Sequence, residues 1–560
     1  MRAVPAQARR GGSALVWPVG AGLIAFLVLM PILSVLWTAF HPTENIWPHL
    51  LATTLPRYLK NTVLLAIGTG SLAAVVGTGA AWLVTMYRFP FSRTMEWLLL
   101  LPLAVPAYVG AFVLVDFLDY SGLVQTGLRK TFGWTSARDY WFPEIRSLWV
   151  ATIVLAAALY PYVYMLARSA FREQSGGSYE VARALGAGPF GLFWRVGLPL
   201  ARPAIAAGTA IVMMETVNDY GVVNYFSVQT LTTGIFSTWL EGGNAGGAAQ
   251  LSSLVLVVIL TLMAVERLGR NHLRFHAAAR HRRPVTSQHL RGPAGWLASA
   301  LCLIPFAVGF ALPVAVMLLH AATSSKAWLS GELARALGNT LLVGGIAAAL
   351  TVLASLFMVY GVRLSRARLP RLLLPVTTLG YAAPGAVLAV GILIPLAAFD
   401  HRLADLILAL TGHEPGLLLT GSAAAIIFAF AVRFFAIAQG AVDGAFGRVA
   451  PSLSLAARSL GRTEGGTLRD VYVPLMKGSI GTALLLVFVD CVKELPATLL
   501  LRPFNFDTLA TRTNERASLE NLSEAAPAAL LIIAVGLIAV LLLARASIPA
   551  GQRARSGPLQ

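Results

Sequence analysis

The stretch SYEVARALGAGPFGLFWRVGLP, from Ser178 to Pro199, is a polar, glycine-interrupted segment between two long apolar runs. It returns as SLAARSLGRTEGGTLRDVYVP, from Ser454 to Pro474. At an offset of 275 residues the two stretches share Ala182 and Ala457, Arg183 and Arg458, Leu185 and Leu460, Gly186 and Gly461, and Pro199 and Pro474. Such fixed spacing indicates an internal duplication. Each copy predicts a short helix stopped by glycine, a loop, and a second short element that ends at proline.

The composition is that of a membrane protein. The 560 residues are 57% hydrophobic and 12% charged, whereas about a quarter of a soluble domain is charged. Apolar runs of about 20 residues recur without period-2 alternation, which predicts a polytopic α-helical protein and disfavours a β-barrel. Cys302 and Cys491 lie in apolar segments, so neither a disulfide framework nor a thiolate metal site is expected.

The apolar runs predict about 12 transmembrane helices, six in each half of the chain. The first run is too long for a signal-peptide core, so we expect an uncleaved first span. Proline-containing spans such as the third are candidates for broken helices. The expected spans are 14–40, 60–86, 97–117, 148–168, 200–222 and 250–267, then 293–321, 338–361, 371–398, 417–438, 476–500 and 526–544.

The distribution of basic residues predicts the orientation. With both termini in the cytoplasm, the inner segments carry about 30 of the 43 Lys and Arg residues and the outer loops about 12. This bias accounts for the net charge of +18 without a nucleic-acid partner. Both repeated loops, at about 178–199 and 453–474, are therefore expected on the cytoplasmic side of the membrane.

The duplication extends beyond these loops. At an offset of 278, Asn61 falls on Asn339 and Pro106 on Pro384. Because each half has an even number of spans, the halves are expected to be parallel repeats. We expect a first membrane domain at 1–270, a basic cytoplasmic linker at 271–292 and a second membrane domain at 293–560. A solvated linker is favoured over one that binds nucleic acid or anionic lipid.

No common catalytic motif is present. The chain lacks the G-x-x-x-x-G-K-[ST] phosphate loop, H-E-x-x-H, a paired CxxC and the G-x-S-x-G elbow. We therefore expect no enzyme activity, no metal site and no cofactor bound by the chain itself.

Acidic residues follow each repeated loop inside an apolar run. Glu215 and Asp219 are four residues apart, and Asp490 and Glu494 hold the corresponding positions beside Lys493. Four-residue spacing predicts one helix face. Acids inside a bilayer are costly and usually face a bundle interior or a water path, so these residues are candidates for a translocation path. The alternative is structural: the acids pair between the halves, with Lys493 neutralising one of them, or lie in the hydrated headgroup zone, and the two interpretations are about equally supported.

Two outer loops share a threonine pattern. In QTLTTGI and DTLATRT, Thr230 falls on Thr508 and Thr233 on Thr511 at an offset of 278. These loops either contact an extracytoplasmic partner or close helix ends through hydroxyl bonds to the backbone, and the second interpretation is favoured.

Local signals in the first repeated loop predict its helix ends. Ser178 is the expected N-cap, Glu180 favours the first-turn dipole, and Gly186 is expected to end the helix in the left-handed conformation. Arg183 is expected to face water or a partner. An amphipathic helix resting on the membrane is the alternative, but two copies on one side favour docking onto a two-fold partner.

The pattern E-x-A-x-x-x-G followed by Leu-Pro, from Glu180 through Ala182 and Gly186 to Pro199, resembles the EAA loop of ABC importer permeases. In that family the loop forms a coupling helix that sits in a groove of a cytoplasmic ATPase. The resemblance assigns this role to Glu180, Ala182, Arg183, Gly186, Pro199, Ala457, Arg458, Gly461 and Pro474. In the second copy Leu455 replaces Glu180, which predicts two docking sites of unequal strength.

The fused two-domain layout resembles the ferric-iron permeases, with VKELPATLLLRPFNFDTLATR, residues 492–512, as the most specific segment. The resemblance implies a permease that carries substrate between its halves. Its implied partners are two copies of an ABC ATPase that uses ATP, a periplasmic substrate-binding protein, and membrane lipid. Related permeases for thiamine or aminophosphonates are alternatives for the substrate, and an ion-coupled secondary transporter is the alternative class.

Overall fold

The computed structural model describes residues 13–42, 44–271, 287–364, 368–378, 380 and 383–546. The described part is almost entirely helical, and its one sheet pairs two short parallel strands. Most of the predicted linker at 271–292 lies outside the described residues, as do both chain ends.

Eleven helices of the described part are long and apolar enough to cross a membrane, or twelve if one bent pair counts as a span. The all-helical polytopic fold expected from the sequence is therefore confirmed. The third and ninth spans were expected at 97–117 and 371–398, but the long helices there begin at Ala107 and Gly385. The reason is local, because Pro106 and Pro384 each occupy the N-cap position, and proline readily starts a helix but does not continue one.

The contacts divide the chain into two compact units that do not follow the order of the sequence. Unit 1 combines the segment up to His41 with Asn339–Phe506, and unit 2 combines Pro42–Gly338 with the segment from Asp507 onward. The boundaries predicted at 270 and 293 describe the sequence duplication and stay a prediction.

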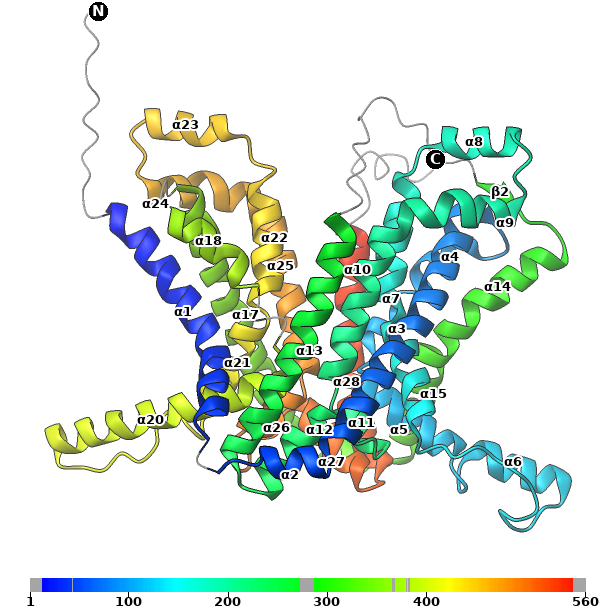
Figure 1. The fold of residues 1–560 in the computed structure, drawn as a ribbon, viewed down its shortest axis with the longest axis horizontal. Helices are drawn as coiled ribbons and strands as arrows, with labels where there is room; N and C mark the ends of the chain where they lie inside the picture. Colours follow the sequence, from blue (N-terminus) through cyan, green and yellow to red (C-terminus); the bar gives the residue numbers. More distant parts are fainter. Residues whose placement is uncertain are drawn as a thin grey trace, which may run out of the picture. The chain divides into compact units, whose positions relative to one another are not determined.

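In unit 1 the first helix of the chain packs against helices from its second half, namely α18, α20 and α21. The short helices α23 and α24 lie at one end of this unit, and α26 lies at the other (Figure 1). The elements are α1 (Ser13–Phe40), α17 (Gly331–Leu364, from Asn339 onward), α18 (Arg368–Val376), α20 (Gly385–Thr411), α21 (Ala423–Arg433), α22 (Phe435–Phe446), α23 (Pro451–Ser459), α24 (Glu464–Thr467), the π-helical turn η5 (Leu468–Tyr472), α25 (Val473–Lys493) and α26 (Pro496–Leu501).

In unit 2, helices α3, α7 and α10 pack together, and the core between them contains the buried rings of Trp82, Tyr160, Tyr164 and Phe171. The first elements are α2 (Trp47–Ala52), α3 (Leu55–Met86), β1 (Tyr87–Arg88), α4 (Ser92–Leu98), the 3-10 turn η1 (Leu101–Ala104), α5 (Ala107–Leu118), α6 (Leu123–Phe132), α7 (Leu148–Glu173), α8 (Gly176–Ala184), α9 (Pro189–Leu192) and the π-helical turn η2 (Phe193–Gly197).

The chain of unit 2 continues through α10 (Leu198–Asn218), α11 (Gly221–Tyr225), α12 (Leu231–Phe236), η3 (Ser237–Glu241), α13 (Ala245–Asn271), β2 (Gln288–His289), α14 (Pro293–Phe306), η4 (Ala307–Ala311), α15 (Leu312–Thr323), α16 (Ser325–Trp328), α27 (Leu509–Ser518) and α28 (Leu522–Ala546). Helices α8 and α9 lie at the same end of this unit as α4, whereas α11 and α12 lie at the other end (Figure 1). The strand β2 pairs with β1 in parallel, so the end of the linker is held beside the end of α3.

The element boundaries repeat with the sequence. Shifting α8, α9, η2 and α10 by 275 residues gives the bounds of α23, α24, η5 and α25. Each copy therefore has the same order of elements, from a short surface helix through a π-helical turn into a long apolar helix. Because π-helical turns are rare and often mark functional sites, their repetition points to this region.

Candidate functional site in the repeated loops

The first repeated loop ends its short helix with a Schellman motif. The amide of Gly186 donates to the carbonyl of Arg183 at 2.9 Å, and the amide of Ala187 donates to the carbonyl of Ala182 at 2.9 Å. Gly186 has φ of +83°, and nothing lies within 4 Å of a Cβ built on it. The requirement for glycine is therefore conformational, because the left-handed region is costly for residues with a Cβ.

The second loop has the same ending. The amide of Gly461 donates to the carbonyl of Arg458 at 3.1 Å, and the amide of Arg462 donates to the carbonyl of Ala457 at 3.1 Å. Gly461 has φ of +82°. The left-handed conformation predicted for Gly186 is thus confirmed and has a counterpart in the other copy.

The expected start of the first loop helix was wrong. Helix α8 begins at Gly176, with Ser175 at the N-cap position, so Ser178 lies inside the helix and caps nothing. Glu180 consequently lies beyond the first turn, where the helix dipole favours it little. The helix starts earlier because Gly176 and Tyr179 are buried against the unit, which capping rules based on sequence do not take into account.

Each loop helix has a buried side and an apolar exposed side. Ala182 packs against the core of unit 2, and Ala457 is buried in unit 1, so both positions need a small side chain. The equivalent leucines Leu185 and Leu460 are 83% and 84% exposed. Because equally exposed leucines recur at equivalent positions in both copies, we interpret them as part of a contact surface.

The exposed sides of the two loops differ beyond these leucines. In the first loop Glu180 is exposed, together with the apolar side chains of Val181 and Phe190. In the second, Leu455 is 64% exposed, and Arg458 lies 3.6 Å from Glu464 in an ion pair. The first copy presents a carboxylate where the second presents a leucine.

An aromatic cluster that the sequence patterns did not predict lies beneath the first loop. The ring centroid of Trp82 lies 5.3 Å from that of Phe171 and 5.2 Å from that of Phe193. The Tyr179 hydroxyl donates to the side-chain oxygen of Gln174, and burial raises the pKa of this hydroxyl. These contacts fix the loop to α3 and α7.

A matching cluster supports the second loop. Tyr360 stands at the position of Trp82, at an offset of 278, and its ring centroid lies 5.9 Å from that of Phe446. The Tyr360 hydroxyl donates to the carbonyl of Glu464 at 2.6 Å, and Tyr472 packs against Phe446. A search of the sequence for aromatic residues repeated at an offset of 278 would have found Trp82 and Tyr360.

The loops connect directly to the acidic residues. After each π-helical turn the chain enters α10 or α25, in which Pro199 or Pro474 occupies the first turn. Each helix has 21 residues and so spans about 30 Å. Glu215 lies near the far end of α10, and Asp490 and Lys493 lie near the far end of α25.

The prediction that each acidic pair shares one helix face was wrong. Helix α10 ends at Asn218 and α25 at Lys493, so Asp219 and Glu494 lie in the turns that follow. The carboxylate of Asp219 accepts the amide of Val222 at 2.9 Å, at the start of α11. Glu494 accepts the amides of Ala497 and Thr498 at 3.0 and 3.1 Å, at the start of α26. Both carboxylates therefore accept amides in the first turn of a short helix that follows the end of the longer one.

Two of the acidic residues also pair with cations. Lys493 lies 2.8 Å from Asp490 on the same helix, and Arg433 lies 3.4 Å from Glu494 within unit 1. The structural interpretation, in which Lys493 neutralises one acid, therefore describes part of the arrangement. A role of these side chains in translocation stays a prediction.

The threonines of the outer loops close helix ends, as the favoured interpretation expected. Thr230 and Thr233 exchange side-chain and backbone hydrogen bonds in a capping box at the start of α12. Thr508 and Thr511 form the same box at the start of α27. The hydroxyl groups of these threonines are therefore engaged in local hydrogen bonds at the helix ends.

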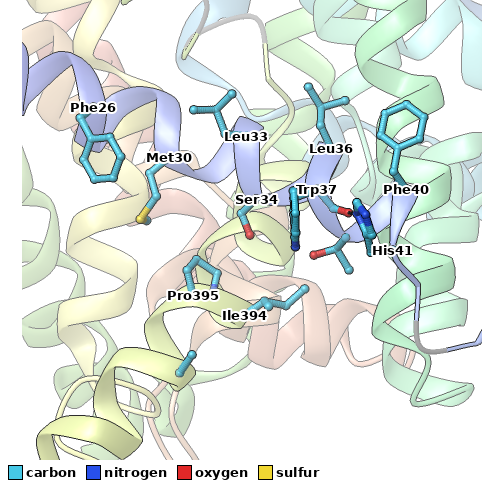
Figure 2. Close-up of a pocket in the computed structure, with 12 residues that line it drawn as sticks. Phe26, Met30, Leu33, Ser34, Leu36, Trp37, Phe40, His41, Ile394 and Pro395 are labelled. Atoms are coloured by element: carbon cyan, nitrogen blue, oxygen red, sulfur yellow. Dashed lines mark hydrogen bonds between the residues drawn. The ribbon is translucent and has the colours of Figure 1, made fainter.

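A groove between α1 and α20 in unit 1 has a volume of about 630 Å³ (Figure 2). Trp37 and His41 stack at one end of α1, with ring centroids 4.2 Å apart, and Pro395 lies opposite them. The lining contains no carboxylate, so the groove has no ligand set for a metal cation. Elsewhere in the described part of the chain, no group of three or more His, Cys, Asp and Glu side chains is placed to hold a metal ion.

The spans, the repeated loops and the long helices that lead away from them are features of a membrane permease. Residues 66–271 match the family described as binding-protein-dependent transport system inner membrane component. The chain is therefore a multi-pass inner-membrane protein of the ABC importer permease type, and it resembles the ferric-iron permeases.

Relatives agree with this assignment. The chain is 24% identical over 489 residues to the Fe(3+)-transport system permease protein FbpB 2 of Haemophilus influenzae, covering 87% of this chain and 89% of the relative. It is 23% identical to the ferric transport system permease protein FbpB of Actinobacillus pleuropneumoniae, covering 86% and 70%. The molybdenum transport system permease protein ModB of Escherichia coli is 26% identical over 37% of this chain and 92% of its own length.

Proposed function

We propose that this chain forms the transmembrane path of an importer for ferric iron and is driven by a separate ATPase. The observation that carries the proposal is the pair of loops that end in the same glycine motif, each with an exposed leucine and a long helix leading from it. The names of the relatives that match most of the chain support iron as the substrate.

Two copies of a cytoplasmic ABC ATPase dock on the loops at about 178–199 and 453–474. Exposed Leu185 and Leu460 give each ATPase copy the same apolar anchor, whereas Glu180 and Leu455 make the two contacts unequal. The positive-inside bias supports the cytoplasmic placement of both loops and both termini. ATP is used by the ATPase, and the chain itself binds no cofactor.

The loops transmit the closure of the ATPase pair through α10 and α25. A rigid helix carries a displacement at one end to the other, and each of these helices runs from a loop to the acidic residues. Glu215, Asp490 and Lys493 line the path, and Asp219 and Glu494 shape it by holding α11 and α26. A periplasmic binding protein delivers the substrate, and membrane lipid surrounds the spans.

The test reconstitutes the chain in proteoliposomes with its ATPase and its binding protein. We expect uptake of ferric iron that requires ATP and the binding protein, and no uptake when the ATPase is inactivated. Thiamine or an aminophosphonate as the ligand of the binding protein would overturn the substrate but not the class. Uptake that survives loss of the ATPase and collapses with the proton gradient would instead identify an ion-coupled carrier.

A further inference from the structure

One span of the second repeat is bent where its counterpart is continuous. Helices α21 and α22 meet at Phe434 with a bend of 48°. Their first residue, Ala423, falls at an offset of 275 from the start of α7, which runs without a break from Leu148 to Glu173. The bend therefore distinguishes the two repeats.

A buried ion pair lies at this bend. Arg433, the last residue of α21, has Nη1 3.4 Å from Oε1 of Glu494, and the side chains are 11% and 2% exposed. The same Glu494 carboxylate accepts two backbone amides at the start of α26. One carboxylate therefore ties the bend to the short helix that follows α25.

The ion pair fits closely against a glycine, Gly385. A Cβ on Gly385, the first residue of α20, would collide with both Nη1 of Arg433 and Oε1 of Glu494. The first repeat has Ala158, Ala107 and Asp219 at the positions of Arg433, Gly385 and Glu494. The first repeat therefore has a shorter acid and no arginine at these positions. Its Asp219 keeps the hydrogen bond to the start of α11 but has no counterpart of the ion pair to Arg433.

We propose that Arg433 and Glu494 are a positioning pair for transport, which holds the bend at Phe434 and the start of α26 in one arrangement. A buried ion pair contributes little net stability but strongly penalises removal of one partner, so it selects one geometry. The helix break that the pair holds then belongs to the second repeat, and substrate passage depends on the pair even though neither residue lies in a repeated loop.

The experiment compares Glu494→Gln, Arg433→Met, Arg433→Lys and the double variant Arg433→Met/Glu494→Gln in the full chain in lipid nanodiscs. Glutamine keeps one acceptor oxygen for the amide of Ala497 but places an NH2 donor where the other oxygen accepts the amide of Thr498. Glu494→Gln therefore removes the charge together with one of the two bonds to α26, so the exchange at 434–440 is the decisive measurement. Asp219→Asn is the matched control in the first repeat. Hydrogen exchange is followed in peptides covering 434–440 and 495–502, alongside thermal unfolding and uptake in proteoliposomes.

We expect Glu494→Gln and Arg433→Met each to exchange about tenfold faster in these two peptides, because the local opening becomes easier. The double variant should recover its unfolding temperature but keep the fast exchange at 434–440 and the loss of uptake. Arg433→Lys keeps a cation opposite Glu494, so it should retain the slow exchange and the uptake of the native chain. Asp219→Asn should affect α11 and leave α7 unchanged.

Unchanged exchange at 434–440 in both single variants would overturn the proposal. Recovery of exchange and uptake in the double variant would also overturn it, since the pair would then serve packing alone. The exchange measurement needs neither substrate nor ATPase, so it stands even if the proposed iron transport fails.

Discussion

Substitution of Gly186 by alanine tests whether the glycine-ended loop is needed for its backbone conformation. Gly186 has φ of +83°, and a Cβ at this position would have no heavy atom within 4 Å apart from its chain neighbours, so the substitution introduces no collision. Its cost is then the left-handed conformation alone, about 1–2 kcal/mol for a residue with a Cβ. This changes the ratio of ordered to disordered loop by a factor of about 5–30.

The same loop offers a matched control. Gly188 also has open space around it, but its φ is −71°, a value that alanine adopts freely. Gly188→Ala should therefore leave the loop intact, and Gly186→Asn should be milder than Gly186→Ala because asparagine tolerates the left-handed region. The pair Gly461→Ala and Gly465→Ala repeats the comparison in the second loop.

The assay combines hydrogen exchange of the amides of Gly186 and Ala187 with ATP-driven uptake in the reconstituted importer. We expect Gly186→Ala to speed exchange by the factor above and to lower uptake per ATP hydrolysed, with membrane insertion unchanged. Equal exchange and equal uptake in Gly186→Ala and Gly188→Ala would refute the reasoning, because the two variants differ only in the backbone conformation they require.

Three further predictions follow from the same geometry. Thr230→Ala and Thr508→Ala each remove a capping box and should lower stability by about 1 kcal/mol, whereas serine at either position should largely restore it, as measured by thermal unfolding. Glu180→Ala and Leu455→Ala should impair ATP-driven uptake to different extents. Only Glu180→Ala should change how uptake depends on salt concentration, because only it removes a charge. Equal losses of uptake with equal salt dependence would contradict unequal docking. Hydrogen bonds from the amides of Ser136 and Thr135 lower the pKa of Asp139, so the contribution of this carboxylate to loop order is present above its unfolded pKa and is lost as pH falls through the lower folded value. Exchange of these two amides should accelerate in acid in the native chain but be independent of pH, after correction for intrinsic rates, in Asp139→Asn.

Features that depend on neighbouring residues could be predicted from the amino-acid sequence. The repeated loops, the left-handed glycines and the threonine caps are local, since the backbone bonds that satisfy them lie within a few residues. The number of spans and the helical class also follow from the apolar runs, because a bilayer admits few backbone structures.

Features that join distant segments became visible only in the folded chain. Glu494 leaves its expected helix face because it caps α26 and meets Arg433, which is far from it in the sequence. Helix α8 starts early because Tyr179 is buried, and α1 packs with the later helices of unit 1. A carboxylate, an aromatic ring or an apolar face has several satisfactory partners in principle, and the tertiary packing selects one of them. The sequence thus identifies the repeated loops, whereas the structure determines which charged side chains hold the helices in place.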